Sequence, residues 1–192
     1  MMKWRRGAAL AALVSIVALA GCPRAPGTGG SAATGPPPEI RETLPDLTFT
    51  TLEGRSVRLA DLRGKVVVLD VWHMLCLGCV EELTHYQAAP ELVANRQVAL
   101  LAVTEDTNET ALRKFVEEKG WTFPVASITP AVRQALLGPG QAVLPQVRVL
   151  GPEGLLHYRL GPEQANVETL KQLVRKLLPA SPDRAAEGKP TG

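Results

Sequence analysis

The sequence has 192 residues, 45% of them hydrophobic and 21% charged, which is enough for one ordinary folded domain with appendages. The formal charge of +2 comes from the start of the chain, because removing Lys3, Arg5 and Arg6 leaves 18 basic and 19 acidic residues. This balance excludes a protein that binds nucleic acid through a clustered basic surface, so no partner of that class is expected.

Residues 1–21 have the layout of an export signal. The basic residues of 3–6 precede the apolar stretch 8–20, which is too short to cross a bilayer, and small residues then lead to Cys22. The exit sequence Leu19-Ala20-Gly21-Cys22 resembles the lipobox of bacterial lipoproteins, which implies a signal peptide over 1–21, acylation of Cys22 and a membrane anchor. An ordinary signal peptide with an incidental cysteine and a retained, uncleaved anchor are the alternatives.

Two segments lack the residues to build a core. Nine of the 17 residues in 22–38 are Pro or Gly, which predicts a tether, and 179–192 has the composition of a disordered tail. The folded domain is therefore predicted over 39–178.

Pro23 stands where an Asp would signal retention at the inner membrane, so an outer-membrane anchor facing the periplasm is favoured if the source has two membranes.

The first half of the domain predicts strands flanking one long helix. A hairpin is expected from 47–50 and 55–59, which flank a Glu-Gly turn. The near-continuous β-branched run 66–72 predicts a strand covered on both faces. A helix over 78–94 and a buried strand over 97–103 follow.

The second half continues the alternation. Asp106 or Asn108 is expected to cap a helix that runs to Lys119 and ends at Gly120. The remaining predictions are a strand over 122–126, a short helix over 130–137, a hairpin of 146–150 and 155–160, and a last helix over 163–178. This order predicts an α/β domain with a central mixed sheet and helices on both faces.

The chemistry is concentrated in a C-x-x-C pair. Cys76 and Cys79 stand where the strand 66–72 gives way to a helix. A cysteine at a helix N-terminus faces free N–H groups and the positive end of the dipole, which favour the reactive thiolate, and a second cysteine one turn on can resolve a mixed disulfide. Half of a zinc site and an inert structural disulfide are the alternatives, but no further cysteine remains apart from Cys22 and no metal is expected.

Asp70 and Pro145 add to this interpretation. Asp70 interrupts a buried strand, so burial should raise its pKa, and its place six residues before Cys76 lets it accept the proton of Cys79. A hydrogen-bonded or edge-exposed Asp70 without a redox role is the alternative. Pro145 precedes a strand, where prolines are common and usually trans.

The domain resembles the TlpA/ResA-type thioredoxin-like family. The resemblance is carried by 44–72, by Cys76-x-x-Cys79-x-x-Glu82 and by Leu144-Pro145. It implies a thioredoxin-like fold with an N-terminal hairpin extension and a central helix–strand insertion at about 108–126. It also implies an extracytoplasmic thiol–disulfide oxidoreductase with protein disulfide substrates, an upstream membrane electron donor and no cofactor beyond the redox disulfide. We expect a monomer.

The resemblance implies a role for each site residue. Cys76 is the nucleophile, Cys79 the resolving cysteine and Asp70 the buried acid. Trp72 matches the tryptophan of the family's F-W motif and is expected at the substrate side. Leu144-Pro145 matches the cis-proline position whose backbone docks an extended substrate.

The sequence departs from the family's pattern at four places. Leu75 replaces the usual Trp before the first cysteine, and Leu77-Gly78 lacks the usual Pro, which predicts a less restrained loop with an altered reduction potential. His73 stands where a small residue is common, and it either tunes the thiolate or has no function. Gln146 replaces an acidic residue of the haem-maturation branch.

Two other functions remain open on this pattern. A peroxiredoxin-like peroxidase shares the N-terminal half, although such enzymes place Thr or Ser where His73 stands. A copper-binding assembly factor would use Cys-x-x-x-Cys with a distal histidine. The cysteine spacing here is one residue short, and His157 is the one plausible partner.

Overall fold

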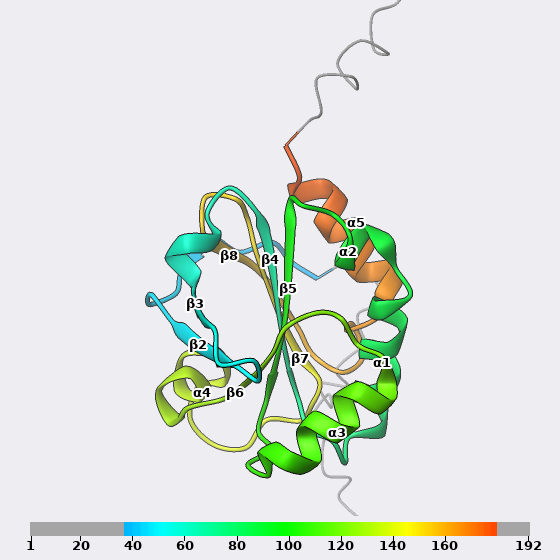
Figure 1. The fold of residues 1–192 in the computed structure, drawn as a ribbon. Coiled ribbons are helices and arrows are strands. Elements are labelled where there is room, and N and C mark those ends of the chain that lie inside the picture. Colours follow the sequence, from blue (N-terminus) through cyan, green and yellow to red (C-terminus); the bar gives the residue numbers. More distant parts are fainter. Residues whose placement is uncertain (1–36, 180–192) are drawn as a thin grey trace, which may run out of the picture. The chain divides into compact units, whose positions relative to one another are not determined.

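The computed structural model describes residues 37–179. The predicted signal peptide, the lipidation site at Cys22 and nearly all of the tether and tail lie outside this range. The described residues form an eight-stranded mixed sheet in the order β1-β8-β7-β4-β5-β6-β2-β3 (Figure 1). The strands are β1 (Glu42–Thr43), β2 (Thr48–Thr51), β3 (Ser56–Arg58), β4 (Val66–Trp72), β5 (Val98–Thr104), β6 (Val125–Ser127), β7 (Gln146–Leu150) and β8 (Leu155–Leu160).

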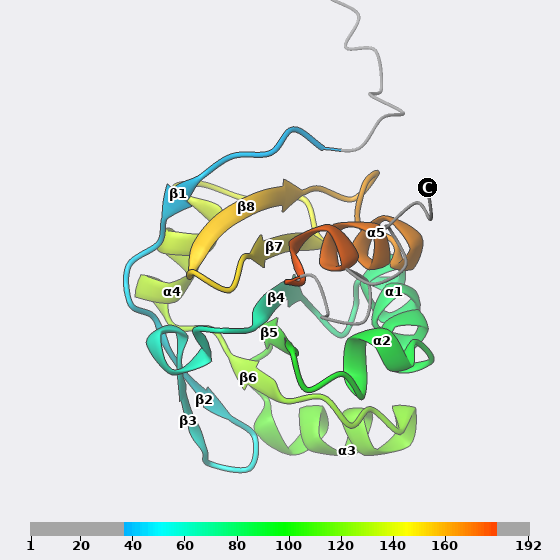
Figure 2. The same cartoon turned by 90° about the horizontal axis from the view of Figure 1, so that it is seen from above.

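Helices cover both faces of this sheet, as predicted (Figure 2). They are α1 (Leu77–Gln87), α2 (Pro90–Val93), α3 (Glu109–Lys119), α4 (Pro130–Leu137), α5 (Val167–Leu177) and the 3-10 helix η1 (Leu59–Leu62). We call the side covered by α1, α2, α3 and α5 the α1 face, with Leu83, Leu112 and Leu170 in its core. The opposite side carries α4 and η1.

Strand β4 lies in the middle of the sheet and leads to the cysteines. It is parallel to β5 and antiparallel to β7, and all seven of its residues are buried. Its side chains alternate, so that Val68 and Trp72 enter the core of the α1 face while Leu69 and Val71 enter the opposite one. Asp70 therefore points to the α1 face, the side on which Cys79 is buried.

The predicted N-terminal hairpin and central insertion extend one edge of the sheet. β2 pairs with β3 and, on its other side, antiparallel with β6. The insertion is α3, which packs on the α1 face through Leu112, followed by β6, which is parallel to β5. The two-residue β1, which the sequence did not predict, pairs with β8 at the other edge.

The predicted single helix over 78–94 is wrong, because the chain breaks before Pro90. Ala89, the residue before this proline, is extended with φ −107° and ψ 98°. A following proline disfavours helical geometry at this position and itself suits a first helical turn. The segment therefore forms α1, which ends at Gln87, and the separate short helix α2.

Three further boundaries differ from prediction. β6 begins at Val125 rather than 122, since Pro124 has no N–H for the ladder. α5 begins at Val167 rather than 163, where the Asn166 side chain accepts the Thr169 N–H at 2.9 Å. Asn108, not Asp106, caps α3. The predicted helix over 130–137 and both predicted hairpins are confirmed.

Candidate active site

Cys76 and Cys79 form a disulfide at the start of α1, with their Cα atoms 5.3 Å apart. Cys76 is the N-cap of the helix, and its Sγ accepts the backbone N–H of Cys79 at 3.2 Å. This contact places the first sulfur at the positive end of the helix, where a thiolate is stabilised. Cys76 is half-buried and Cys79 is completely buried, so attack from outside can reach only the first sulfur.

Asp70 lies in the core beneath this helix. It is fully buried, and neither carboxyl oxygen has a hydrogen-bond partner within the described residues. Burial raises the pKa of Asp70 well above its usual range. The structure thus differs from the alternative of a hydrogen-bonded or edge-exposed carboxylate.

Glu82 is a second buried acid, which the sequence interpretation names as part of the family motif without giving it a role. It lies on α1, one turn after Cys79, and its Oε1 accepts the hydroxyl of Tyr86. Burial and the charge of Asp70 raise the pKa of Glu82 well above its usual range. The spacing from Cys79 to Glu82 is the one available signal, because residues three apart share a helix face. Glu82 also lines a surface cavity of about 280 Å³.

The Leu144–Pro145 peptide bond is cis, as the resemblance implied. Pro145 is buried directly before β7, Leu144 is half-buried and Val143 is 74% exposed. Leu75 and Leu77, which flank Cys76 in the chain, are 84% and 83% exposed. These three are the exposed large hydrophobic residues within residues 37–179.

Trp72 does not lie at the substrate side, which corrects the expectation for it. Its side chain is completely buried in the α1-face core. Its ring centroid is 5.1 Å from that of Trp121, in an edge-to-face arrangement, and 6.1 Å from that of Phe115. Trp72 therefore supports the active-site loop from inside the domain and cannot contact a docked substrate in this conformation.

His73 and Asp106 meet beside the cysteines. The His73 Nε2 is 3.0 Å from Asp106 Oδ1, and the histidine is 35% exposed while the carboxylate is nearly buried. Asp106, a candidate helix cap in the sequence, instead binds the loop before Cys76 through the Met74 N–H at 2.8 Å.

His157 does not lie with Cys76 and Cys79. It therefore cannot complete a copper site with these two cysteines. It lies on β8, where Nδ1 is 3.1 Å from Glu39 Oε1 and Nε2 is 2.5 Å from Glu153 Oε1. Both ring nitrogens are thus engaged away from Cys76. Within residues 37–179, no three His, Cys, Asp or Glu side chains converge as metal ligands.

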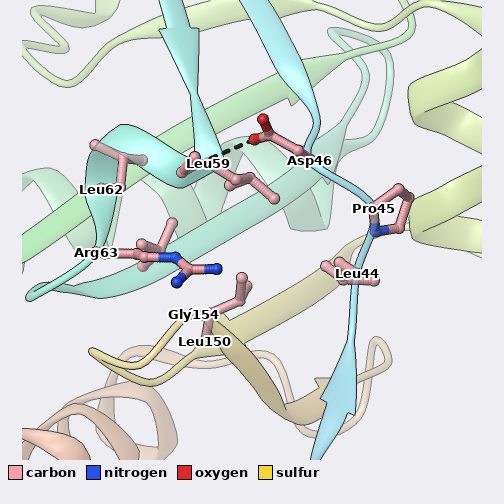
Figure 3. Close-up of a pocket in the computed structure, with 10 residues that line it drawn as sticks. Leu44, Pro45, Asp46, Leu59, Leu62, Arg63, Leu150 and Gly154 are labelled. Carbon is pink, nitrogen blue, oxygen red and sulfur yellow. Dashed lines mark hydrogen bonds between the residues drawn. The ribbon is translucent and has the colours of Figure 1, made fainter.

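A separate hollow of about 180 Å³ lies between the segment before β2 and the turn that joins β7 to β8 (Figure 3). Leu44, Leu59 and Leu62 contribute apolar walls, and Arg63 also lines it. None of the predicted redox residues lines this hollow, so it is not part of the candidate site.

No helix in the described part of the chain has the length and apolarity needed to cross a membrane.

Comparison with known proteins identifies the family of the chain. Residues 40–159 match the model of the AhpC/TSA family. The thiol-disulfide oxidoreductase ResA of Bacillus thuringiensis is 28% identical over 142 residues, which cover 73% of this chain and 80% of the relative. ResA of Geobacillus thermodenitrificans is 35% identical over 86 residues, 45% of this chain and 49% of that protein.

The fold has a solved counterpart in a thiol:disulfide interchange protein of the thioredoxin family from Chlorobium tepidum. That structure matches with a TM-score of 0.64 at 19% identity, covering 73% of this chain and 98% of the other. The predicted thioredoxin-like fold, TlpA/ResA-type relationship and thiol–disulfide oxidoreductase class are confirmed. Because the family model matches more than half of the 192 residues, the chain belongs to the AhpC/TSA family.

Proposed function

We propose that this protein is an extracytoplasmic, membrane-tethered oxidoreductase that reduces disulfides of protein clients through Cys76 and Cys79. The observation that carries the proposal is the pairing of a half-buried sulfur at the N-cap of α1 with a fully buried one. This asymmetry suits thiol–disulfide exchange, in which one sulfur attacks the client and the other resolves the mixed disulfide.

The reductive half-reaction uses the dithiol form. The Cys76 thiolate attacks a client disulfide, forming a mixed disulfide and expelling one client thiolate. The Cys79 thiol then loses its proton, and its sulfur attacks Cys76 and expels the second client thiolate. Two electrons pass to the client, and the Cys76–Cys79 disulfide forms. A dithiol donor outside this chain, expected at the membrane, must reduce that disulfide again.

Asp70 is the group we assign to the proton of Cys79. Its raised pKa keeps it protonated in the disulfide form. When the donor opens the disulfide, Asp70 gives this proton to the Cys79 sulfur and becomes a carboxylate. In the resolving step it takes the proton back, so the buried thiolate forms next to a neutralised acid.

The client side is the apolar rim formed by Leu75, Leu77 and Val143. Exposed apolar side chains cost free energy in water unless a partner covers them. Leu75 and Leu77 flank the attacking sulfur in the chain, and Val143 directly precedes the Leu144-Pro145 bond. A client segment with apolar residues beside its cysteine would cover them while its backbone docks at the proline. The rim therefore favours protein disulfides over small hydrophilic ones.

The anchor is proposed from the sequence before the domain. Signal-peptide cleavage before Cys22 and acylation of this residue would tether the domain through 22–38, most simply at the outer membrane of a two-membrane cell. Radioactive palmitate should label the full chain in cells and fail to label the Cys22→Ala variant. Labelling that survives this change would reject Cys22 as the lipidation site.

The catalytic proposal is tested by insulin reduction with the full chain. Cys76→Ser should abolish the activity, and Cys79→Ser should accumulate a mixed disulfide at Cys76 that the wild type resolves. Unchanged reduction by Cys76→Ser would reject the nucleophile. Cys22→Ala serves as the matched cysteine control and should reduce insulin at the wild-type rate.

A further inference from the structure

In the loop from His73 to Cys76, which joins β4 to α1, three backbone N–H groups donate to only two residues. The Met74 N–H donates to Asp106 Oδ2 at 2.8 Å. The Leu75 N–H donates to His73 Nδ1 at 3.0 Å, and the Cys76 N–H donates to the His73 carbonyl at 2.9 Å. Three successive N–H groups that lead to the reactive sulfur thus depend on His73 and Asp106.

The hydrogen bonds of the His73 ring define which of its two nitrogens carries the proton. A backbone N–H can only donate, so Nδ1 must offer Leu75 a lone pair, and the ring proton lies on Nε2. That proton faces Asp106 Oδ1 at 3.0 Å. The neutral ring therefore donates to the carboxylate on one side and accepts from the loop on the other.

Asp106 anchors this arrangement to the central sheet. Its Oδ2 also accepts the Thr104 hydroxyl at 2.7 Å, and its own N–H donates to Thr104 Oγ1 at 3.1 Å. Thr104 is completely buried at the end of β5, in register with Trp72 at the end of β4. The loop is thus tied to the ends of the two central parallel strands.

We propose that His73 is a positioning residue for thiol–disulfide exchange, which with Asp106 clamps the loop so that Cys76 stays at the N-cap of α1 after its disulfide opens. We call this pair the His73–Asp106 clamp. The inference rests on the proposed function of Cys76 as nucleophile. It assigns to this histidine a role in holding the thiolate that needs no positive charge on the ring.

The clamp matters most in the dithiol form. In the disulfide form the bond to Cys79 itself holds Cys76, whereas after reduction the loop is held by its hydrogen bonds and by the packing of Met74 and Cys76 against the α1-face core. Gly78, in the first turn of α1, adds little restraint, since glycine lacks the fixed φ of proline. A contact that favours one state more than the other shifts the equilibrium between them.

The test compares full-length wild type with His73→Ala and His73→Asn. The Asn side chain can accept the Leu75 N–H in an Asx turn but is too short to reach Asp106, so it keeps half of the clamp. The first readout is the rate at which iodoacetamide labels Cys76 of the reduced protein, followed on its peptide by mass spectrometry. The second is the dithiol–disulfide equilibrium constant in glutathione buffers.

We expect His73→Ala to slow Cys76 labelling about fivefold and to shift the equilibrium at least threefold towards the disulfide, with His73→Asn in between. His85→Ala removes an exposed histidine of α1 and should match the wild type. A lower melting temperature with both readouts unchanged would mean a merely structural role and would overturn the proposal.

The Asn variant decides the matter if His73→Ala does not fold. If the labelling rate and the equilibrium constant of His73→Asn equal those of the wild type, the contact between His73 and Asp106 contributes nothing. This result also overturns the clamp. Neither readout involves a client. A wild type that fails to reduce insulin would therefore reject the proposed function while the labelling rates still test the clamp.

Discussion

Asp70 and Glu82 are two buried carboxyl groups on the α1 face, and burial together with the charge of Asp70 raises the pKa of Glu82. Asp70 has no access to solvent, whereas Glu82 lines a surface cavity. Two neighbouring carboxylates cannot both ionise at low cost in an apolar core, so the pair retains at least one proton at neutral pH. The carboxyl pair thus holds the proton that the Cys79 sulfur takes up when the disulfide opens.

Glu82→Gln should stabilise the protein in a pH-dependent way. Gln keeps the size of Glu and an acceptor for the Tyr86 hydroxyl. The folded pKa of Glu82 is raised, so its contribution to stability falls as the pH rises from the unfolded pKa towards the folded one. We expect the variant to gain about 1–3 kcal/mol in free energy of unfolding at pH 7.5 and little at pH 4.5.

Urea unfolding at the two pH values measures this gain. Glu81→Gln changes the exposed neighbouring carboxylate on the same helix and should leave the free energy of unfolding unchanged at both. An equal gain at pH 4.5 and pH 7.5 for Glu82→Gln would contradict a raised pKa as its cause.

Asp70→Asn should slow the resolving step and spare the attacking one. Without the carboxylate, the buried Cys79 thiol has no partner to take its proton, and positioned acid–base groups contribute roughly 100-fold or more to such steps. We expect the mixed disulfide at Cys76 to persist roughly 100-fold longer or more in single-turnover quench experiments. Iodoacetamide labelling of Cys76 should stay near the wild-type rate. An unchanged lifetime of the mixed disulfide would remove Asp70 from the mechanism.

The parts of the site that lie close together in the sequence were predictable from it. A buried strand followed at once by a helix bearing Cys76 and Cys79 has a defined local geometry, and an acid inside that strand must be buried with it. The cis state of the Leu144–Pro145 bond came only from the family resemblance, because strand-entry prolines are usually trans.

Contacts between distant segments were not predictable. His73 meets Asp106 only because β4 and β5 are parallel and in register at Trp72 and Thr104, and neither segment shows that pairing by itself. The burial of Trp72 likewise depends on Trp121, which the α3–β6 insertion brings beneath it. Boundaries failed where a local residue overrode the apolar pattern, as Pro90 does after α1.

The peroxidase alternative makes a distinct prediction. Such enzymes place a hydroxyl residue where His73 stands, and here both ring nitrogens of this histidine are engaged by Leu75 and Asp106. We therefore expect the reduced protein to consume hydrogen peroxide no faster than free cysteine in stopped-flow measurements. Consumption that exceeds free cysteine by orders of magnitude and disappears in Cys76→Ser would establish a peroxidase instead.

The apolar rim predicts which disulfides the protein prefers. Leu75→Ser and Leu77→Ser each remove an exposed leucine beside the attacking sulfur without opening a hole in the core. If a client covers these side chains, each change should forfeit about 1–2 kcal/mol of burial, and so raise KM for insulin disulfides roughly 5- to 30-fold. Oxidised glutathione has no apolar flank to cover them, so its reduction should continue at the wild-type rate and serves as the internal control. Equal losses for both substrates would place the effect in the chemistry of Cys76 rather than in docking, and the rim would then have no part in choosing clients.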